Sequence, residues 1–255
     1  MTVPLQRVIG RFLSATGLGW LPVRVRRGFT SGAWWSLYPW TSYWRGTYEP
    51  AVQAALVRLG DIRGWNCWDL GAHFGFYSIG LAQRVGPQGE VAAFEPNPLS
   101  FRRLAYHRRL NRLSWLKLYA AAASDQTGRM ELYTYGDLTT TTTHLPYDGE
   151  TRTHACAPLA VPALRLDELV AAHDLRPPEF VKIDVEGHGH RALAGMKEVV
   201  RSKRPILLAA LHSPQEADGI FGFLKPLGYA SRPVGEFAVT DATRIGRDFL
   251  FTPPA

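Results

Sequence analysis

The sequence is poor in cysteine and contains no long apolar run. Its 255 residues include only two cysteines, Cys67 and Cys156, which excludes a disulfide framework and a zinc site built from several thiolates. No uninterrupted apolar stretch reaches the roughly 18 residues that a membrane-spanning helix requires, and the N-terminus lacks the basic-then-apolar order of a secretory signal. We therefore expect a cytoplasmic location.

Acidic residues are scarce at the start of the chain. The first 50 residues contain one acid, Glu49, against six arginines, and they hold five of the eight tryptophans. Basic and aromatic side chains together are typical of surfaces that contact lipid head groups, glycolipids or nucleic acid. They are also expected of an aromatic lid that packs on the main domain with its arginines in solvent. Residues 1–45 are therefore predicted to be a basic, tryptophan-rich extension or lid, and peripheral membrane contact stays open as an alternative role.

The rest of the chain alternates between two kinds of segment. Its composition, 46% hydrophobic and 20% charged, is typical of a folded globular protein. From about residue 64, short apolar runs alternate with amphipathic stretches, which indicates strands and helices around a mostly parallel sheet. This order predicts a Rossmann-like, doubly wound α/β fold whose ligands lie beyond the carboxyl ends of the strands. We predict strands at 65–70, 90–94, 116–122, 180–184, 205–211 and 249–251, and helices at 76–85, at 99–112 and from the fourth strand to residue 200.

Residues 134–160 interrupt this alternation. They include five consecutive threonines at 139–143, flanked by glycines and prolines. Such a long stretch without a periodic pattern predicts a surface loop insertion, which is either functional or a mobile segment with no specific role.

A glycine turn follows the first strand of this region. Gly71 and Gly75 flank Ala72, His73 and Phe74, and because the two glycines lack side chains, a ligand can approach the backbone at the start of the next helix. Glu95 stands 20 residues after Gly75, at the end of the second strand. A carboxylate at that position can accept both ribose hydroxyls of a nucleoside cofactor.

Two details favour S-adenosylmethionine over a dinucleotide. Asp69 directly precedes the turn, where its charge would repel a pyrophosphate but could pair with the ammonium group of the methionine moiety. The full G-x-G-x-x-G pattern is absent, because His73 stands where its second glycine is expected.

Four ordered segments carry a family resemblance: 44–50, 69–77, 94–98 and 181–187. Together they resemble the motifs of FkbM-type S-adenosylmethionine-dependent methyltransferases, and the match extends from about residue 40 to residue 230. The resemblance implies that residues 46–255 form a class I methyltransferase domain. It also implies methyl transfer, most often to a hydroxyl oxygen of a sugar, glycolipid or other natural product.

The resemblance also implies a set of cofactor-binding residues. Three positions depart from the family pattern: His73 replaces an asparagine, while Gly189 and Ala210 replace glutamates. Two acids are thus missing near the expected acceptor site, which leaves the substrate class and any metal requirement open. The implied cofactor residues are Tyr48, Glu49, Asp69, Gly71, Ala72, His73, Gly75, Glu95, Pro96, Asn97, Ala122, Ser124 and Asp184.

The acceptor side is expected just after the fourth and fifth strands. Asp184, Glu186, His188 and His190 alternate along the chain, and on an extended backbone they would share one face suited to a divalent metal. The intervening glycines favour a bend instead, so a metal site stays open. A hydroxyl acceptor also needs a general base, for which His212 and His188 are the first candidates, with Asp184 or Glu186 orienting the imidazole or acting in its place.

Arginine recurs along the helix predicted at 99–112. The favoured interpretation is a solvent-exposed helix face, and nucleic-acid binding is the less favoured alternative. We expect a small-molecule, glycan or lipid acceptor and leave the oligomeric state open. The competing hypotheses are methylation of a nucleic-acid ribose or of nitrogen, and a binding protein that keeps the cofactor site without turnover.

Overall fold

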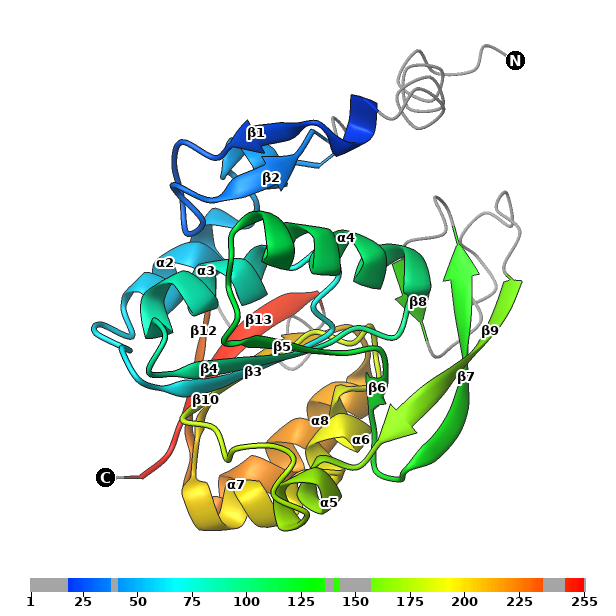
Figure 1. Ribbon diagram of the computed structural model, residues 1–255. Coiled ribbons are helices and arrows are strands. Elements are labelled where there is room, and N and C mark those ends of the chain that lie inside the picture. Colours follow the sequence, from blue (N-terminus) through cyan, green and yellow to red (C-terminus); the bar gives the residue numbers. More distant parts are fainter. Residues whose placement is uncertain (1–17, 38–40, 136–139, 143–156, 236–245, 255) are drawn as a thin grey trace.

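The computed structural model describes residues 18–37, 41–135, 140–142, 157–235 and 246–254 (Figure 1). Its centre is a seven-stranded sheet in the order β12-β13-β11-β10-β3-β4-β5. β13 runs antiparallel to both of its neighbours, and the other neighbouring strands are parallel. The strands are β3 (Asn66–Leu70), β4 (Glu90–Phe94), β5 (Leu116–Tyr119), β10 (Phe180–Ile183), β11 (Ile206–Leu211), β12 (Ala230–Pro233) and β13 (Arg247–Thr252).

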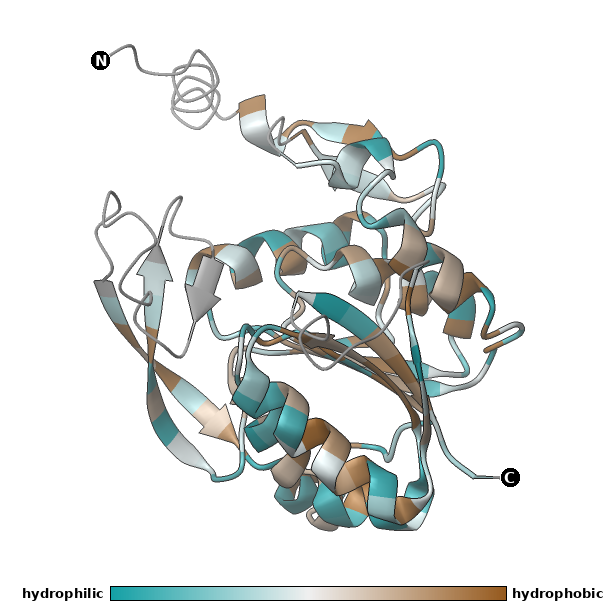
Figure 2. Ribbon diagram, turned by 180° about the vertical axis from the view of Figure 1, so that it is seen from behind, coloured by the Kyte–Doolittle hydropathy of each residue, from teal (hydrophilic) through white to brown (hydrophobic). Residues whose placement is uncertain are grey.

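Helices cover both faces of this sheet, as the alternating pattern predicts. One layer contains α2 (Pro50–Val57), α3 (Phe76–Val85) and α4 (Pro98–Leu110). The other contains α5 (Leu166–Ala171), α6 (Gly189–Ala194), α7 (Lys197–Lys203) and α8 (Pro214–Leu224), followed by η3 (Lys225–Leu227). The strands between the layers are largely hydrophobic, whereas the outer helices carry many hydrophilic residues (Figure 2). The Rossmann-like fold is therefore confirmed.

The N-terminal segment packs on α4. It contains η1 (Leu18–Trp20), the paired strands β1 (Pro22–Arg24) and β2 (Trp34–Ser36), and η2 (Tyr43–Arg45). Trp35 is completely buried and stacks on the His107 ring at 3.8 Å. The Ser36 amide donates to His107 Nε2, so Nδ1 carries the proton and donates to the Phe74 carbonyl. The described part of the predicted extension thus shares one hydrophobic core with α3 and α4.

A second, four-stranded sheet corrects two sequence predictions. It contains β6 (Ala122–Ala123), β7 (Gly128–Tyr135), β8 (Thr140–Thr142) and β9 (Ala157–Leu164), in the order β6-β9-β7-β8. The strand predicted at 116–122 is therefore split, because the chain leaves the main sheet after Tyr119. The loop predicted at 134–160 is wrong at 134–135, 140–142 and 157–160, where pairing and the β preference of threonine give strands. Residues 136–139 and 143–156 lie outside the described residues.

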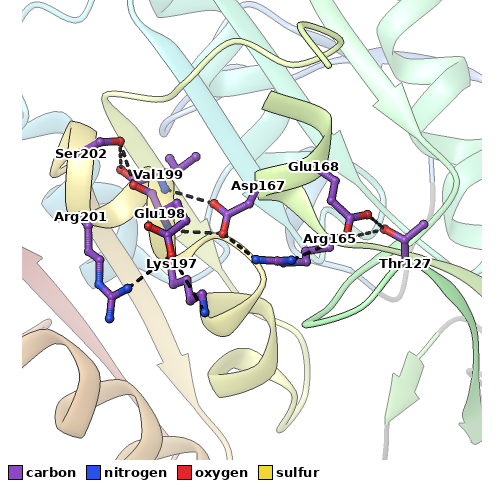
Figure 3. A network of polar contacts seen from close by, with 9 residues as sticks. All are labelled: Thr127, Arg165, Asp167, Glu168, Lys197, Glu198, Val199, Arg201 and Ser202. Atoms are coloured by element: carbon purple, nitrogen blue, oxygen red, sulfur yellow. Dashed lines mark hydrogen bonds and ion pairs between the residues drawn. The ribbon is translucent and has the colours of Figure 1, made fainter. Parts of the chain in front are cut away.

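The long helix predicted up to residue 200 is also split, into α6 and α7. Gly195 separates them, and a Cβ there would lie 1.8 Å from the Ser124 carbonyl oxygen. Met196 provides no side-chain cap for α7, so the carboxylate of Asp167 accepts hydrogen bonds from the Glu198 and Val199 amides instead (Figure 3). The same network joins α5 to the turn before β7 through Arg165, Glu168 and Thr127 (Figure 3).

Candidate functional site

A cavity lies beyond the carboxyl ends of β3, β4 and β10, where a doubly wound sheet is expected to bind its ligands. Its wall combines the turn after β3, the end of β4, the second sheet and the segment after β10, and aromatic rings from η2 and α3 complete it. The lining residues are Tyr43, Tyr48, Gly71, Ala72, His73, Phe76, Tyr77, Phe94, Glu95, Pro96, Ala122, Ala123, Met130, Leu132, Lys182, Asp184, Val185, Glu186 and His188.

Glu95 presents a fixed carboxylate to this cavity. Its Oε2 accepts from the His73 amide and its Oε1 from the Asn97 amide, both at 2.7 Å. An ionised carboxylate has about four acceptor positions, so each oxygen keeps one for a ligand hydroxyl. Burial raises the pKa of Glu95 to about 7, against the lowering effect of the two amides. Asn97 does not line the cavity. Its side chain caps α4 by accepting from Leu99 and Ser100.

The glycine turn depends on close packing as well as on ligand access. Gly71 has φ 85°, and a Cβ there would lie 1.8 Å from the Asp184 carbonyl oxygen. Gly75 has φ 89° and lies outside the cavity, where a Cβ would come within 2.4 Å of Leu104. Only glycine therefore lets β3 and α3 approach β10 and α4 this closely.

Asp69 lies behind the cavity wall. It is 1% exposed, and its Oδ2 accepts from the Ser78 hydroxyl at 2.5 Å. Burial raises the pKa of this carboxyl, whereas the charge of Lys182 opposes the shift. Lys182, rather than Asp69, lines the cavity, so the pairing of Asp69 with a ligand ammonium stays a prediction.

Lys182 contacts both Asp184, after β10, and the aromatic wall from α3. Its Nζ lies 2.7 Å from Asp184 Oδ2 and 4.7 Å from the centroid of the Tyr77 ring. Burial alone would lower its pKa, but the charges of Asp184 and Asp69 outweigh it and raise the pKa. Tyr77 in turn donates to Glu49 Oε2 at 2.6 Å, so Glu49 supports the wall without lining it.

His212 lies among three carboxylates. Its Nε2 is 3.4 Å from Asp184 Oδ1 and 3.7 Å from Glu186 Oε2, and its Nδ1 is 3.4 Å from Glu216 Oε2. Burial lowers its pKa, but Glu216, Asp184 and Glu186 outweigh that effect and raise the pKa to about 9. The imidazole is therefore protonated at neutral pH, and in that form it cannot accept a proton.

Two acids that the sequence analysis did not single out occupy the regions of Gly189 and Ala210. The fully buried Glu216 accepts from the Gly189 and His212 amides, each at 2.7 Å, and a Cβ on Gly189 would lie 2.5 Å from its Oε1. Asp248 on β13 is the register partner of Ala210, and burial raises its pKa to about 6. A capping box from Ser213 to Glu216 was the available sequence signal for Glu216.

The alternating run after β10 does not share one face. Glu186 and Gly187 have φ values of 49° and 94°, so the chain turns before α6, as the glycines favoured. His188 bonds to the Ser124 hydroxyl at 3.0 Å, and burial lowers its pKa to about 4. His190 instead packs against Gly219 of α8. Ser124 therefore contacts the cavity only through His188.

A different trio is arranged for a shared cation. Asp184, Glu186 and His212 each offer a ligand atom, and these atoms lie within 4.8 Å of one another. The same carboxylates already face Lys182 and the protonated His212, so a divalent ion would compete with two positive charges. A metal requirement stays open.

The model described as the methyltransferase FkbM domain matches residues 69–231, which is more than half of the chain. The chain belongs to the FkbM methyltransferase family. It is 26% identical over 135 residues to the hexuronic acid methyltransferase AglP of Haloferax volcanii, a match that covers 53% of this chain and 51% of that protein. The chain therefore spans about half the length of this curated relative.

The crystal structure of methyltransferase FkbM from Methylobacillus flagellatus KT has the same fold. The TM-score is 0.52 at 18% identity, and the match covers 73% of this chain and 43% of that one. Membership of the FkbM family implies binding of S-adenosylmethionine or its demethylated product. The residues present fit such a ligand, because Glu95 keeps acceptor positions for two hydroxyls beside aromatic walls. The sequence analysis missed much of this wall, including Tyr43, Phe76, Tyr77, Lys182 and Leu132.

Proposed function

We propose that this FkbM protein transfers a methyl group from S-adenosylmethionine to a hydroxyl oxygen of a sugar. The observation that carries the proposal is the Glu95 carboxylate, fixed by two backbone amides at a strand end with one acceptor position left on each oxygen. When bound, S-adenosylmethionine supplies an electrophilic methyl group on a positively charged sulfur.

The cofactor side of the site is built to hold a nucleoside. Glu95 accepts the ribose hydroxyls, and Phe94, Pro96, Ala122 and Leu132 provide an apolar surface for the base. His188, kept neutral by its burial, closes this end without placing a charge beside the base. The cofactor-binding roles predicted for Tyr48, Gly71, Ala72, His73 and Asp184 are supported by their place in the wall.

The acceptor side contains the groups that can orient a hydroxyl and take its proton. Asp184 and Glu186 line the cavity, whereas His212 contacts both without lining it. One of these carboxylates accepts the proton, and His212 orients the pair with its positive charge. Tyr43, Tyr48, Phe76 and Tyr77 exclude water, which favours in-line displacement between aligned atoms.

Similarity to a hexuronic acid methyltransferase supports a sugar as the acceptor class. The test is transfer of a labelled methyl group to a panel of uronic acids, neutral sugars and glycolipids, with products identified by mass spectrometry. We expect an O-methyl sugar, and loss of turnover but not of cofactor binding in Glu186→Gln, because Glu186 lines the acceptor side of the cavity. Cofactor binding without transfer to any acceptor would instead support a binding protein, and methylation of RNA would support the ribose alternative.

A further inference from the structure

The outer face of α4 combines apolar and basic side chains. Leu99, Arg102, Tyr106 and Arg109 recur at spacings of three and four residues, so they lie along one side of the helix. The opposite side faces the core through Leu104 and His107. Leu99 is 48% exposed although it is a large apolar residue.

The segment η1 lies directly on this face. Tyr106 donates to the Trp20 carbonyl at 2.7 Å, and the two rings meet edge to face. The guanidinium group of Arg102 lies 5.0 Å from the centroid of the Trp20 ring. Leu18 and Leu21, on either side of Trp20, are 38% and 48% exposed. Apolar side chains therefore project from among arginines along the joint surface of η1 and α4.

The positive charge of the molecule is concentrated around this surface. Over residues 18–37, 41–49 and 98–115, nine arginines accompany a single acid, Glu49, which is bonded to Tyr77. The same segments contain four of the five large apolar residues that are exposed in the described part of the chain, namely Leu18, Leu21, Trp34 and Leu99. Charge of one sign and exposed apolar groups thus coincide.

We propose that η1 and the outer face of α4 form a docking surface for a bilayer that contains anionic lipids. The arginines bind lipid phosphates, and the leucines enter the boundary between head groups and acyl chains. Among the described residues, no helix is long and apolar enough to cross a bilayer. This inference does not depend on the methyl acceptor.

The arrangement favours a membrane over RNA. Single-stranded RNA is held largely by bases that stack on open aromatic faces. Here Arg102 and Arg103 cover the Trp20 ring, and Tyr106 meets it edge to face. Exposed leucines add nothing to phosphate binding, whereas they contribute directly to binding at a bilayer surface.

The test is co-sedimentation of the full chain with vesicles of phosphatidylcholine, either pure or with about a third phosphatidylglycerol. We expect binding to the anionic vesicles only. Arg102→Gln with Arg109→Gln should weaken it about 25-fold, since a basic residue near such a surface contributes about fivefold. Leu18→Ser with Leu21→Ser should also weaken it, whereas the matched control Arg201→Gln with Lys203→Gln, on the opposite layer at α7, should not.

Equal binding to both vesicle types, or an equal loss in the α7 control, would overturn the proposal. So would RNA binding that the arginine changes weaken and the leucine changes leave intact, combined with no vesicle binding. Thermal melting and calorimetric titration with S-adenosylhomocysteine on each variant separate a folding defect from a lost surface. The titration with S-adenosylhomocysteine also tests the cofactor site independently of the vesicle result.

Discussion

At the scale of single residues, Glu95 combines burial, two amide donors and a place in the cavity wall. Its pKa is raised from 4.5 to about 7, chiefly by burial. Ligand hydroxyls donate to the ionised carboxylate, so affinity for S-adenosylhomocysteine should fall as the pH is lowered from about 8 to about 6, by at most about tenfold per pH unit. Calorimetric titration at several pH values measures this.

Glu95→Gln is the control for this prediction. Its amide nitrogen would face one of the two backbone donors, so we expect binding about 1.5–3 kcal/mol weaker and independent of pH in this range. Parental affinity in this variant would contradict the cofactor-site assignment. In the ligand-free protein, the stability contributed by Glu95 changes with pH in the opposite direction to the affinity. The folded state holds a proton that the unfolded chain releases between about 4.5 and 7, so this group's contribution to stability declines as the pH rises through that window.

Glu216 is a second residue whose effect follows from its contacts. Glu216→Gln would place an amide nitrogen against the Gly189 or the His212 amide, which should lower the free energy of unfolding by about 1–3 kcal/mol. Because Glu216 holds His212 rather than the cofactor, kcat should fall more than affinity for S-adenosylmethionine. Denaturant titration and steady-state kinetics measure the two effects. Asp218→Asn, an exposed change on the same helix, should alter neither.

At the scale of elements, α7 depends on a cap supplied by another helix. Asp167 on α5 accepts from the Glu198 and Val199 amides at 3.2 and 3.1 Å. Asp167→Ala should therefore lower the free energy of unfolding by about 1 kcal/mol and leave cofactor binding unchanged. A thermal melt compared with that of Asp174→Ala, an exposed residue without this role, provides the check. An equal effect of the two substitutions would show that the cap contributes nothing.

The elements set by local pattern were predictable from the sequence, whereas those set by distant contacts were not. The β3–α3–β4–α4 region follows from apolar runs, the glycine turn and the Asn97 cap, all readable within a few residues. The break at Gly195 depends on the Ser124 carbonyl, about 70 residues away in the chain, and the second sheet depends on the pairing of β7 with β9.

The residues of the candidate site also fall into those predictable from a local motif and those that depend on strand pairing. Gly71 and Glu95 belong to a local motif from which a nucleoside pocket can be predicted. Lys182 reaches the cavity beside Asp69 only because β10 pairs with β3, and Asp248 meets Ala210 only because β13 pairs with β11. Such cross-strand neighbours need a known topology before their chemistry can be predicted.

At the scale of the whole molecule, the N-terminal segment packs into the main core, and we expect it to unfold together with the rest of the domain. Trp35 contacts the His107, Tyr43 and Phe76 rings in the main core. Trp35→Ala should cost about 3–5 kcal/mol, a large share of the stability of an ordinary domain. The unfolding transitions followed by far-ultraviolet circular dichroism and by tryptophan fluorescence should shift to the same new midpoint. Trp34→Ala, at a neighbouring exposed position, should have a much smaller effect. Separate transitions in Trp35→Ala would show instead that the segment unfolds alone.

The second sheet has a consequence for how relatives diverge. Among the described residues its strands pair with one another and not with the seven-stranded sheet, yet it contributes Met130 and Leu132 to the cavity wall. We therefore expect the second sheet to tolerate exchange as a unit. We expect that swapping it between homologous enzymes would change the cavity rim while leaving the seven-stranded sheet and the Glu95 carboxylate in place.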